Sequence, residues 1–129
     1  MAKRFLEGQL HDVTHPVLSA REVREMQSEA AKISIHDDLT AYAVNIVDAT
    51  RNKAEISCGA SPRALLSMIR CAQALAFMDD RSYCIPEDIA SAAALTLPHR
   101  LVLSSGARLS RVTGEDMIAR ILAQAKVPR

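Results

Sequence analysis

Aromatic residues are almost missing from this sequence, which contains no tryptophan, two tyrosines and two phenylalanines among 129 residues. Alanine and leucine dominate the apolar residues instead, and both favour helix over strand. Nearly half of the residues are apolar, which argues against disorder, and the length suits one domain with its own core. The composition therefore predicts a single all-α domain.

Strong charge of one sign is also missing, since the formal net charge is only +1. A nearly neutral chain has no field that would draw it to nucleic acid or to an anionic membrane. The sequence has no basic recognition helix, which disfavours a helical DNA-binding domain. It has no apolar run long enough to span a bilayer and no signal-peptide pattern, so we expect a cytoplasmic location and no membrane partner.

Cysteines are few, and their spacing carries no metal signature. Cys58, Cys71 and Cys84 follow one another at intervals of 13 residues, without a C-x-x-C pair. The histidines, at positions 11, 15, 36 and 99, give no local ligand pair with them. Cys71 falls among apolar neighbours, where a thiol behaves as a small hydrophobe. We therefore expect neither a metal site nor a disulfide.

Catalytic motifs are missing as well. The chain contains no Gly-x-x-x-x-Gly-Lys-Ser/Thr phosphate loop and no apolar strand that ends in paired acids for magnesium. It contains no nucleophile elbow, and nothing brings a Ser-His-Asp triad together. These absences exclude ATP hydrolysis by this chain alone.

Helix start signals and apolar periodicity are present along most of the chain. Ser19 and Glu22 form a capping box, Asp37 and Asp38 favour a helix N-terminus, and Pro86 suits a first helical position. Together with later signals, these predict a small bundle of four main helices and a fifth, over residues 19–32, 37–51, 61–79, 86–97 and 113–126. Residues 98–112 stay open between a helical turn and an extended piece.

The central helix is expected over residues 61–79, where the sequence is apolar nearly all round. Such a helix is buried by its neighbours. We therefore expect Leu65, Ile69 and Leu75 to lie in the core, whereas Arg63 and Arg70 occupy its least apolar strip.

The start of this helix carries the most unusual local pattern. Ser61 is a good N-cap and Pro62 suits the first helical position, but Arg63 then places a cation at the positive end of the helix dipole. An anion beside Arg63 would explain the arrangement, because N-terminal amides and a guanidinium can converge on a phosphate. The alternative is an arginine that lies free in solvent.

The run Gly59-Ala60-Ser61-Pro62-Arg63-Ala64 resembles the sensor-2 motif of the MoxR family of AAA+ ATPases. The similarity extends in the family's order and spacing over nearly the whole chain. It includes the run from Pro16 through Tyr42, the stretch 83–89, the stretch 99–103 and the closing helix that ends at Pro128.

The resemblance implies a helical lid, residues 19–129, joined by a connecting arm, residues 1–18, to an ATPase core that is missing here. It implies that Arg63 reaches the γ-phosphate of ATP as a catalytic group, and that Gly59, Ala60, Ser61 and Pro62 complete the nucleotide-binding segment. ATP with Mg²⁺ belongs to the full-length protein, and none is expected on this chain. The implied partners are the core, neighbouring subunits of a homo-oligomeric ring, and a client of a chaperone-like remodelling or maturation machine.

A second interpretation is a free-standing helical interaction module without a nucleotide role. Such a module needs a large exposed apolar patch. A phosphate-loop motif encoded just upstream of this sequence would discriminate in favour of the lid.

Overall fold

The computed structural model describes residues 15–128; residues 1–14, which form most of the expected arm, and Arg129 lie outside the described residues. The expected all-α class is confirmed, and the five expected helices form within two residues of their predicted ends. They are α2 (Ala20–Ala30), α3 (Asp37–Ala49), α4 (Pro62–Met78), α5 (Pro86–Thr96) and α7 (Gly114–Gln124).

Local caps set the starts of these helices. Ser19 and Glu22 form the expected capping box of α2. Ser61 begins α4, and Thr113 with Asp116 begins α7. The N-cap of α3 is His36, whose Nδ1 accepts a hydrogen bond from the backbone N–H of Asp38 at 3.3 Å, a cap that the sequence did not suggest. Because these caps join residues two or three apart in sequence, they depend little on what the helix later packs against.

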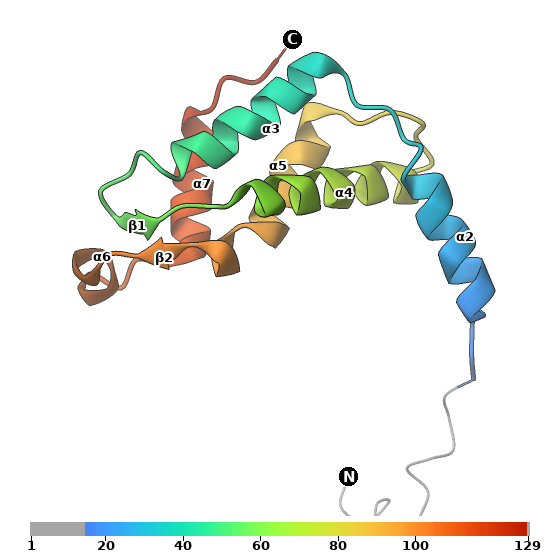
Figure 1. Cartoon of the computed structure of the whole chain (residues 1–129), viewed down its shortest axis with the longest axis horizontal. Helices are drawn as coiled ribbons and strands as arrows, with labels where there is room; N and C mark the ends of the chain where they lie inside the picture. The colour runs from blue at the N-terminus through green and yellow to red at the C-terminus, as the bar shows by residue number, and fades with distance from the viewer. Residues whose placement is uncertain (1–14, 129) are drawn as a thin grey trace, which may run out of the picture.

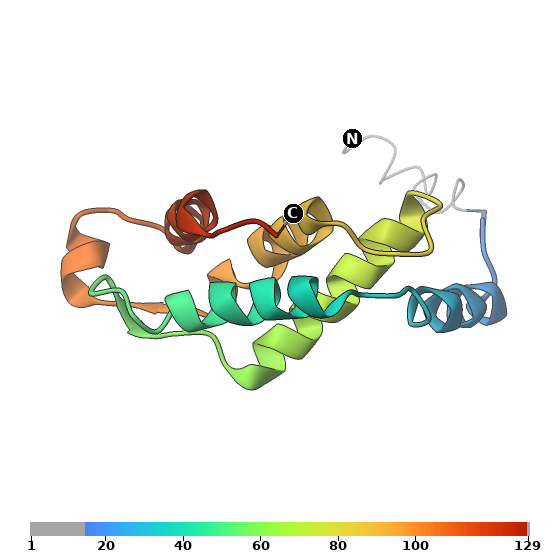
Figure 2. The same ribbon diagram turned by 90° about the horizontal axis from the view of Figure 1, so that it is seen from above.

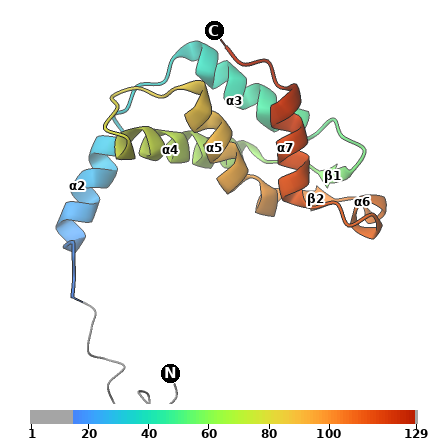
Figure 3. The same cartoon turned by 180° about the vertical axis from the view of Figure 1, so that it is seen from behind.

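The helices form two layers (Figure 1). In the first, α3 runs above α4, and in the second, α5 and α7 cross them, as the view from behind shows (Figure 3). Seen from above, the domain is elongated, with α2 at one end and the segment that carries α6 (Ser105–Leu109) at the other (Figure 2). Helix on helix is the arrangement that buries one apolar stripe of each element.

The core face of α4 differs from the prediction. Its buried residues are Ala64, Met68, Ala72, Gln73 and Ala76, a stripe mostly at every fourth position. Leu65, Ile69 and Leu75 are only half-buried, so the prediction that they form the core is wrong. Because α4 is apolar nearly all round, its sequence does not indicate which face is buried. The close packing of α4 on α5 places the small alanines on the buried face.

Met68 is the one large, fully buried side chain of α4, and the other large ones come from neighbouring elements: Ile46, Ile89, Leu97, Met117, Ile118 and Ile121. Even α4, with 17 residues the longest helix in the described part, is not long and apolar enough to cross a membrane, nor is any other helix of residues 15–128.

A short antiparallel ladder closes the end of the domain opposite α2. Strand β1 (Ile56–Cys58) pairs with β2 (Val102–Leu103), with an irregularity between Ile56 and Cys58. For residues 98–112 the sequence left a helical turn and an extended piece open. The structure has both, because the 3₁₀ turn η2 (Pro98–Arg100) leads directly into β2. The pairing joins segments more than forty residues apart, which explains why no local signal predicted it.

Helix α2 is the least buried of the main helices. It has no buried residue, and its main packing partner is α4. The side chain of Gln73, buried on α4, donates hydrogen bonds to the carbonyl oxygens of Ala31 and Ile33 at 3.3 and 2.8 Å. These bonds hold the chain at the point where it leaves α2 for α3.

Candidate functional site

The segment from Gly59 to Arg63 leads from β1 into α4, and its last residue lies in the first turn of that helix. The Ser61 hydroxyl accepts a hydrogen bond from the backbone N–H of Ala64 at 3.3 Å, and Pro62 occupies the first helical position. Arg63 is exposed, and within residues 15–128 its guanidinium has neither an acidic partner nor a hydrogen-bond acceptor. The arginine is therefore presented to its surroundings rather than used in packing.

The end of α3 holds this segment through a buried hydroxyl. Thr50 is fully buried, and its Oγ1 accepts a hydrogen bond from the backbone N–H of Ala60 at 2.9 Å while donating to the carbonyl of Val47 at 2.6 Å. Ala60 is itself buried, so no water can replace that bond without exposing the segment. The backbone two residues before Pro62 is thus fixed to α3.

A second clamp comes from Arg51, which follows Thr50 just beyond the end of α3. The guanidinium of Arg51 donates through Nη2 and Nε to the carbonyl oxygen of Ala60, at 3.1 and 3.4 Å, and its Nη1 lies 3.2 Å from Asp48. Both polar backbone groups of Ala60 are therefore bonded to adjacent side chains. Sequence reasoning missed Thr50 and Arg51 as supports, because their partner Ala60 lies ten and nine residues away across a loop.

The close packing around residue 59 leaves no room for a side chain, so this position requires a glycine. A Cβ built on it would lie 2.7 Å from Thr50 Oγ1 and 2.8 Å from Arg51 Cγ, both closer than real contacts allow. The glycine lets the loop pass directly against the two clamping side chains.

The start of α4 offers few backbone donors to an anion. Pro62 has no N–H, and the N–H of Ala64 is taken by Ser61, which leaves the N–H of Arg63 among the first three helical residues. The first three residues of α4 therefore offer one free backbone N–H, fewer than the several amides that we expected to converge on a phosphate. The guanidinium of Arg63 is the group that would carry an anion contact here, with Gly59, Ala60, Ser61 and Pro62 shaping the backbone beneath it.

A basic segment lies at the same end of the domain as this loop. Residues 98–111 include three arginines and no acidic residue. The pairing of Val102 with Cys58 brings Arg100, two residues before Val102, to the same end of the domain as Gly59. Nε of Arg100 donates to Nε2 of His99 at 3.3 Å, so this exposed histidine is engaged with its neighbour.

No metal centre is built by the described residues, which contain no group of three or more His, Cys, Asp or Glu able to hold a metal ion. All three cysteines are free thiols. Burial raises the pKa of Cys84 to about 11, which keeps this thiol protonated at neutral pH. Burial also raises the pKa of the half-buried Cys71.

The most extensive ion pair lies away from Arg63, at the turn between α4 and α5. Two bonds of 2.6 and 2.7 Å join Arg81 to Asp88, whose Oδ2 also accepts the N–H of Ile85 at 2.8 Å. The hydrogen bond from Arg81 is the main reason that the pKa of Asp88 is lowered, against the opposing effect of burial. Bonds to Asp88 and then Asp79 raise the pKa of Arg81. Because its acceptors are filled from within the domain, this pair fixes the turn.

The two-layer helical bundle with an exposed arginine at the start of α4 is a small lid-type domain. A family model described as "AAA lid domain" matches residues 48–121, more than half of the chain. The chain belongs to this family.

Comparison with individual proteins agrees. The chain is 34% identical over 122 residues to "Chaperone MoxR1" of Mycobacterium tuberculosis, covering 88% of this chain and 32% of that protein. It is 32% identical over 117 residues to "Uncharacterized protein YeaC" of Bacillus subtilis, covering 91% of this chain and 37% of that protein. The chain thus spans about a third of the length of these curated relatives.

A solved structure gives the same result. The crystal structure of a "putative ATPase" from Cytophaga hutchinsonii superposes with a TM-score of 0.83 at 26% identity, covering 99% of this chain and 42% of that one. The resemblance stated from the sequence is confirmed: the chain is a lid domain of a MoxR-like AAA+ ATPase.

Proposed function

We propose that this domain senses nucleotide for a MoxR-like ATPase, with Arg63 reaching the γ-phosphate of ATP bound where lid and core meet. The observation that carries the proposal is an exposed guanidinium without an acidic partner in residues 15–128, on a backbone clamped by Thr50 and Arg51. A planar guanidinium suits a phosphate because it donates two parallel hydrogen bonds. A fixed backbone matters because transition-state stabilisation depends on donors that need no reorganisation.

The residues present fit one part of the ligand. Arg63 and the positive segment 98–111 suit a phosphate, whereas the described residues offer no ligand set for Mg²⁺. ATP and Mg²⁺ would therefore be held mainly by the core, and the phosphoryl group would be supplied there. The work of this chain is to present Arg63 and to move with the core as the nucleotide changes. Membership in the family supports association with such a core and assembly into a ring.

The wider role is proposed by analogy with the relatives. One relative is named a chaperone, which supports a chaperone-like remodelling or maturation function, in the cytoplasm, on a protein client. Exposed apolar side chains such as Leu66 and Leu95, at 64% and 63% exposure, are available to cover another domain. They would also suit a free-standing interaction module, and a phosphate-loop sequence encoded upstream distinguishes the two.

Replacement of Arg63 tests the proposal in the full-length protein. Arg63→Ala should lower kcat for ATP hydrolysis on the order of 10²-fold or more, because the lost contact strengthens as charge on the γ-phosphate rearranges. Arg63→Lys should rescue poorly, since lysine lacks the planar fork. The matched control is Arg24→Ala, which removes another exposed arginine without a partner in residues 15–128 and should leave kcat unchanged.

The isolated chain supplies the second half of the test. Arg63→Ala should change its unfolding free energy by less than about 0.5 kcal/mol, as at other surface positions. Calorimetry should detect no micromolar ATP binding, because one arginine cannot replace a phosphate loop. Wild-type ATPase rates in full-length Arg63→Ala, or unfolding of the isolated variant, would remove the support for a sensing role.

A further inference from the structure

Arg51 holds the peptide group through which the chain enters α4. Its Nη2 and Nε donate to the carbonyl oxygen of Ala60 at 3.1 and 3.4 Å, and that carbonyl belongs to the peptide group that joins Ala60 to Ser61. Ser61 is the N-cap of α4, two residues before Arg63. Because a peptide group is a rigid plane, fixing its oxygen restricts the direction in which the chain enters the helix. Arg51 therefore acts on the backbone that carries Arg63.

Thr50 holds a different peptide group, the one that joins Gly59 to Ala60. Its Oγ1 accepts the N–H of Ala60 at 2.9 Å, and the residue is fully buried. Arg51 differs because its side chain is 46% exposed, so water can bond to the Ala60 carbonyl once the guanidinium is removed. We therefore expect Thr50 to contribute mainly to the stability of the domain and Arg51 mainly to the orientation of the helix start.

The guanidinium of Arg51 is already occupied within the domain. Nε and Nη2, a pair of donors that could grip a phosphate side-on, both donate to the Ala60 carbonyl, and Nη1 lies 3.2 Å from Oδ1 of Asp48. Asp48 also balances the charge of Arg51, whereas Arg63 has no acidic partner among residues 15–128. Arg51 is therefore suited to hold a neighbouring segment, and Arg63 to meet an anion.

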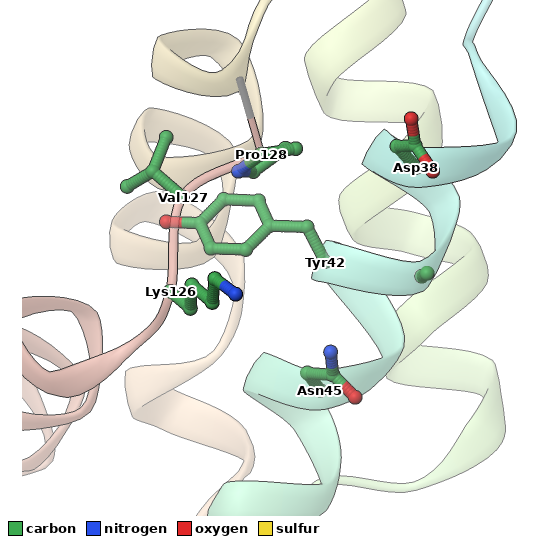
Figure 4. A pocket seen from close by; sticks show the side chains of 7 residues that line it. Asp38, Tyr42, Asn45, Lys126, Val127 and Pro128 are labelled. Atoms are coloured by element: carbon green, nitrogen blue, oxygen red, sulfur yellow. The ribbon is translucent and has the colours of Figure 1, made fainter.

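Helix α3 gives this clamp a firm base. Five of its residues are buried, and the helix packs against α4, α5 and α7. Near its start, the buried ring of Tyr42 extends to lie beside Lys126 and Val127 of the segment after α7 (Figure 4). Arg51 thus reaches the Ala60 carbonyl from the end of a helix that is packed along its length.

We propose that Arg51 is a positioning residue for ATP hydrolysis by the full-length ATPase, acting through Arg63 by fixing the Ala60 carbonyl. The proposal rests on the proposed role of Arg63 at the γ-phosphate and adds the residue that sets its approach. A donor stabilises a transition state best when it needs no reorganisation, and a displacement of about 1 Å can cost on the order of 10²-fold in rate. Loss of Arg51 should therefore lower kcat and leave KM unchanged, since the core holds the nucleotide.

Arg51→Met in the full-length ATPase tests the proposal. Methionine keeps an unbranched stem beside Gly59 and removes every donor. The variant should lower kcat for ATP hydrolysis about ten-fold, with KM for ATP within about two-fold of wild type. Arg51→Lys should recover part of the loss, because an ammonium can bond to the Ala60 carbonyl but lacks the planar fork. The matched control is Arg120→Met, which removes an exposed arginine 4.0 Å from Glu55 and should leave both constants unchanged.

A double-mutant cycle shows whether Arg51 works through Arg63. In an Arg63→Ala background, Arg51→Met should lower kcat by less than about two-fold, because the group that it positions is gone. A ten-fold loss in both backgrounds would mean that Arg51 acts on its own, and wild-type kcat in Arg51→Met alone would mean that it positions nothing; either result overturns this proposal. Wild-type kcat in Arg63→Ala would instead remove the sensing role, and this inference with it.

Backbone dynamics of this chain alone give a readout apart from activity. In Arg51→Met, ¹⁵N relaxation order parameters of the Ser61 and Arg63 amides should fall from about 0.85 toward about 0.6. The Ala60 amide, still bonded to Thr50, should keep its value. The melting temperature should fall by no more than about 4 °C. Unchanged order parameters at Ser61 and Arg63, or a much larger fall in melting temperature, would make Arg51 a structural residue and overturn the positioning role.

Discussion

The Thr50 clamp gives the most direct test of how the Arg63 loop is held. The change Thr50→Val keeps the shape of a fully buried side chain and removes its hydroxyl. The N–H of Ala60, 2.9 Å from that hydroxyl, would then be buried without a partner. The carbonyl of Val47 would keep a donor, because the backbone N–H of residue 50 also reaches it at 3.1 Å. The net effect of the substitution is therefore one buried donor, the N–H of Ala60, without an acceptor.

An unpaired buried N–H costs about 1–3 kcal/mol. With a urea m-value of about 2 kcal/mol/M, the unfolding midpoint should fall by about 0.5–1.5 M. Thr50→Ser is the matched control, because it keeps the hydroxyl and removes one methyl group, at about 0.8 kcal/mol.

Urea unfolding followed by circular dichroism measures both losses, and amide hydrogen exchange separates their causes. The Ala60 amide should exchange much faster in Thr50→Val, whereas Thr50→Ser should retain its protection. If the Ala60 amide is equally protected in both variants, or if the serine variant is the less stable, the hydroxyl does not hold the loop.

Three further predictions concern other parts of the domain. Gly59→Ala should cost about 1–3 kcal/mol of stability because its Cβ would meet Thr50 at 2.7 Å, whereas Gly106→Ala, with open space around it, should be neutral or stabilising in urea unfolding. Met68→Ala, at a fully buried position of α4, should cost about 2–5 kcal/mol in the same assay, and an unchanged midpoint would show that α4 is not the centre of the core. Asp88→Asn should cost about 3 kcal/mol at pH 7, because it breaks a buried ion pair. Since the folded pKa of Asp88 is lowered, its contribution is present above the unfolded value of about 3.9 and is lost as pH falls through the folded value. The gap between wild type and Asp88→Asn should therefore close below about pH 4 in urea titrations, and a gap independent of pH would contradict the assignment.

The sequence alone determined where the helices begin and what kind of segment precedes α4. Ser19 with Glu22, Ser61 with Pro62, and Thr113 with Asp116 act within one helical turn, so their effect does not wait for the fold. The motif at residues 59–64 likewise indicated the family, which the matches confirm. The role of Arg63 stays a prediction.

Only the tertiary structure decided which face of α4 is buried and what holds the Arg63 loop. An almost uniformly apolar helix leaves its buried face to its neighbours, and α5 selects alanines over Leu65 and Ile69. Thr50 reaches Ala60 across a loop, and β1 meets β2 across more than forty residues. Such contacts depend on the packing of segments distant in sequence, and no short pattern in the chain records which of them will meet.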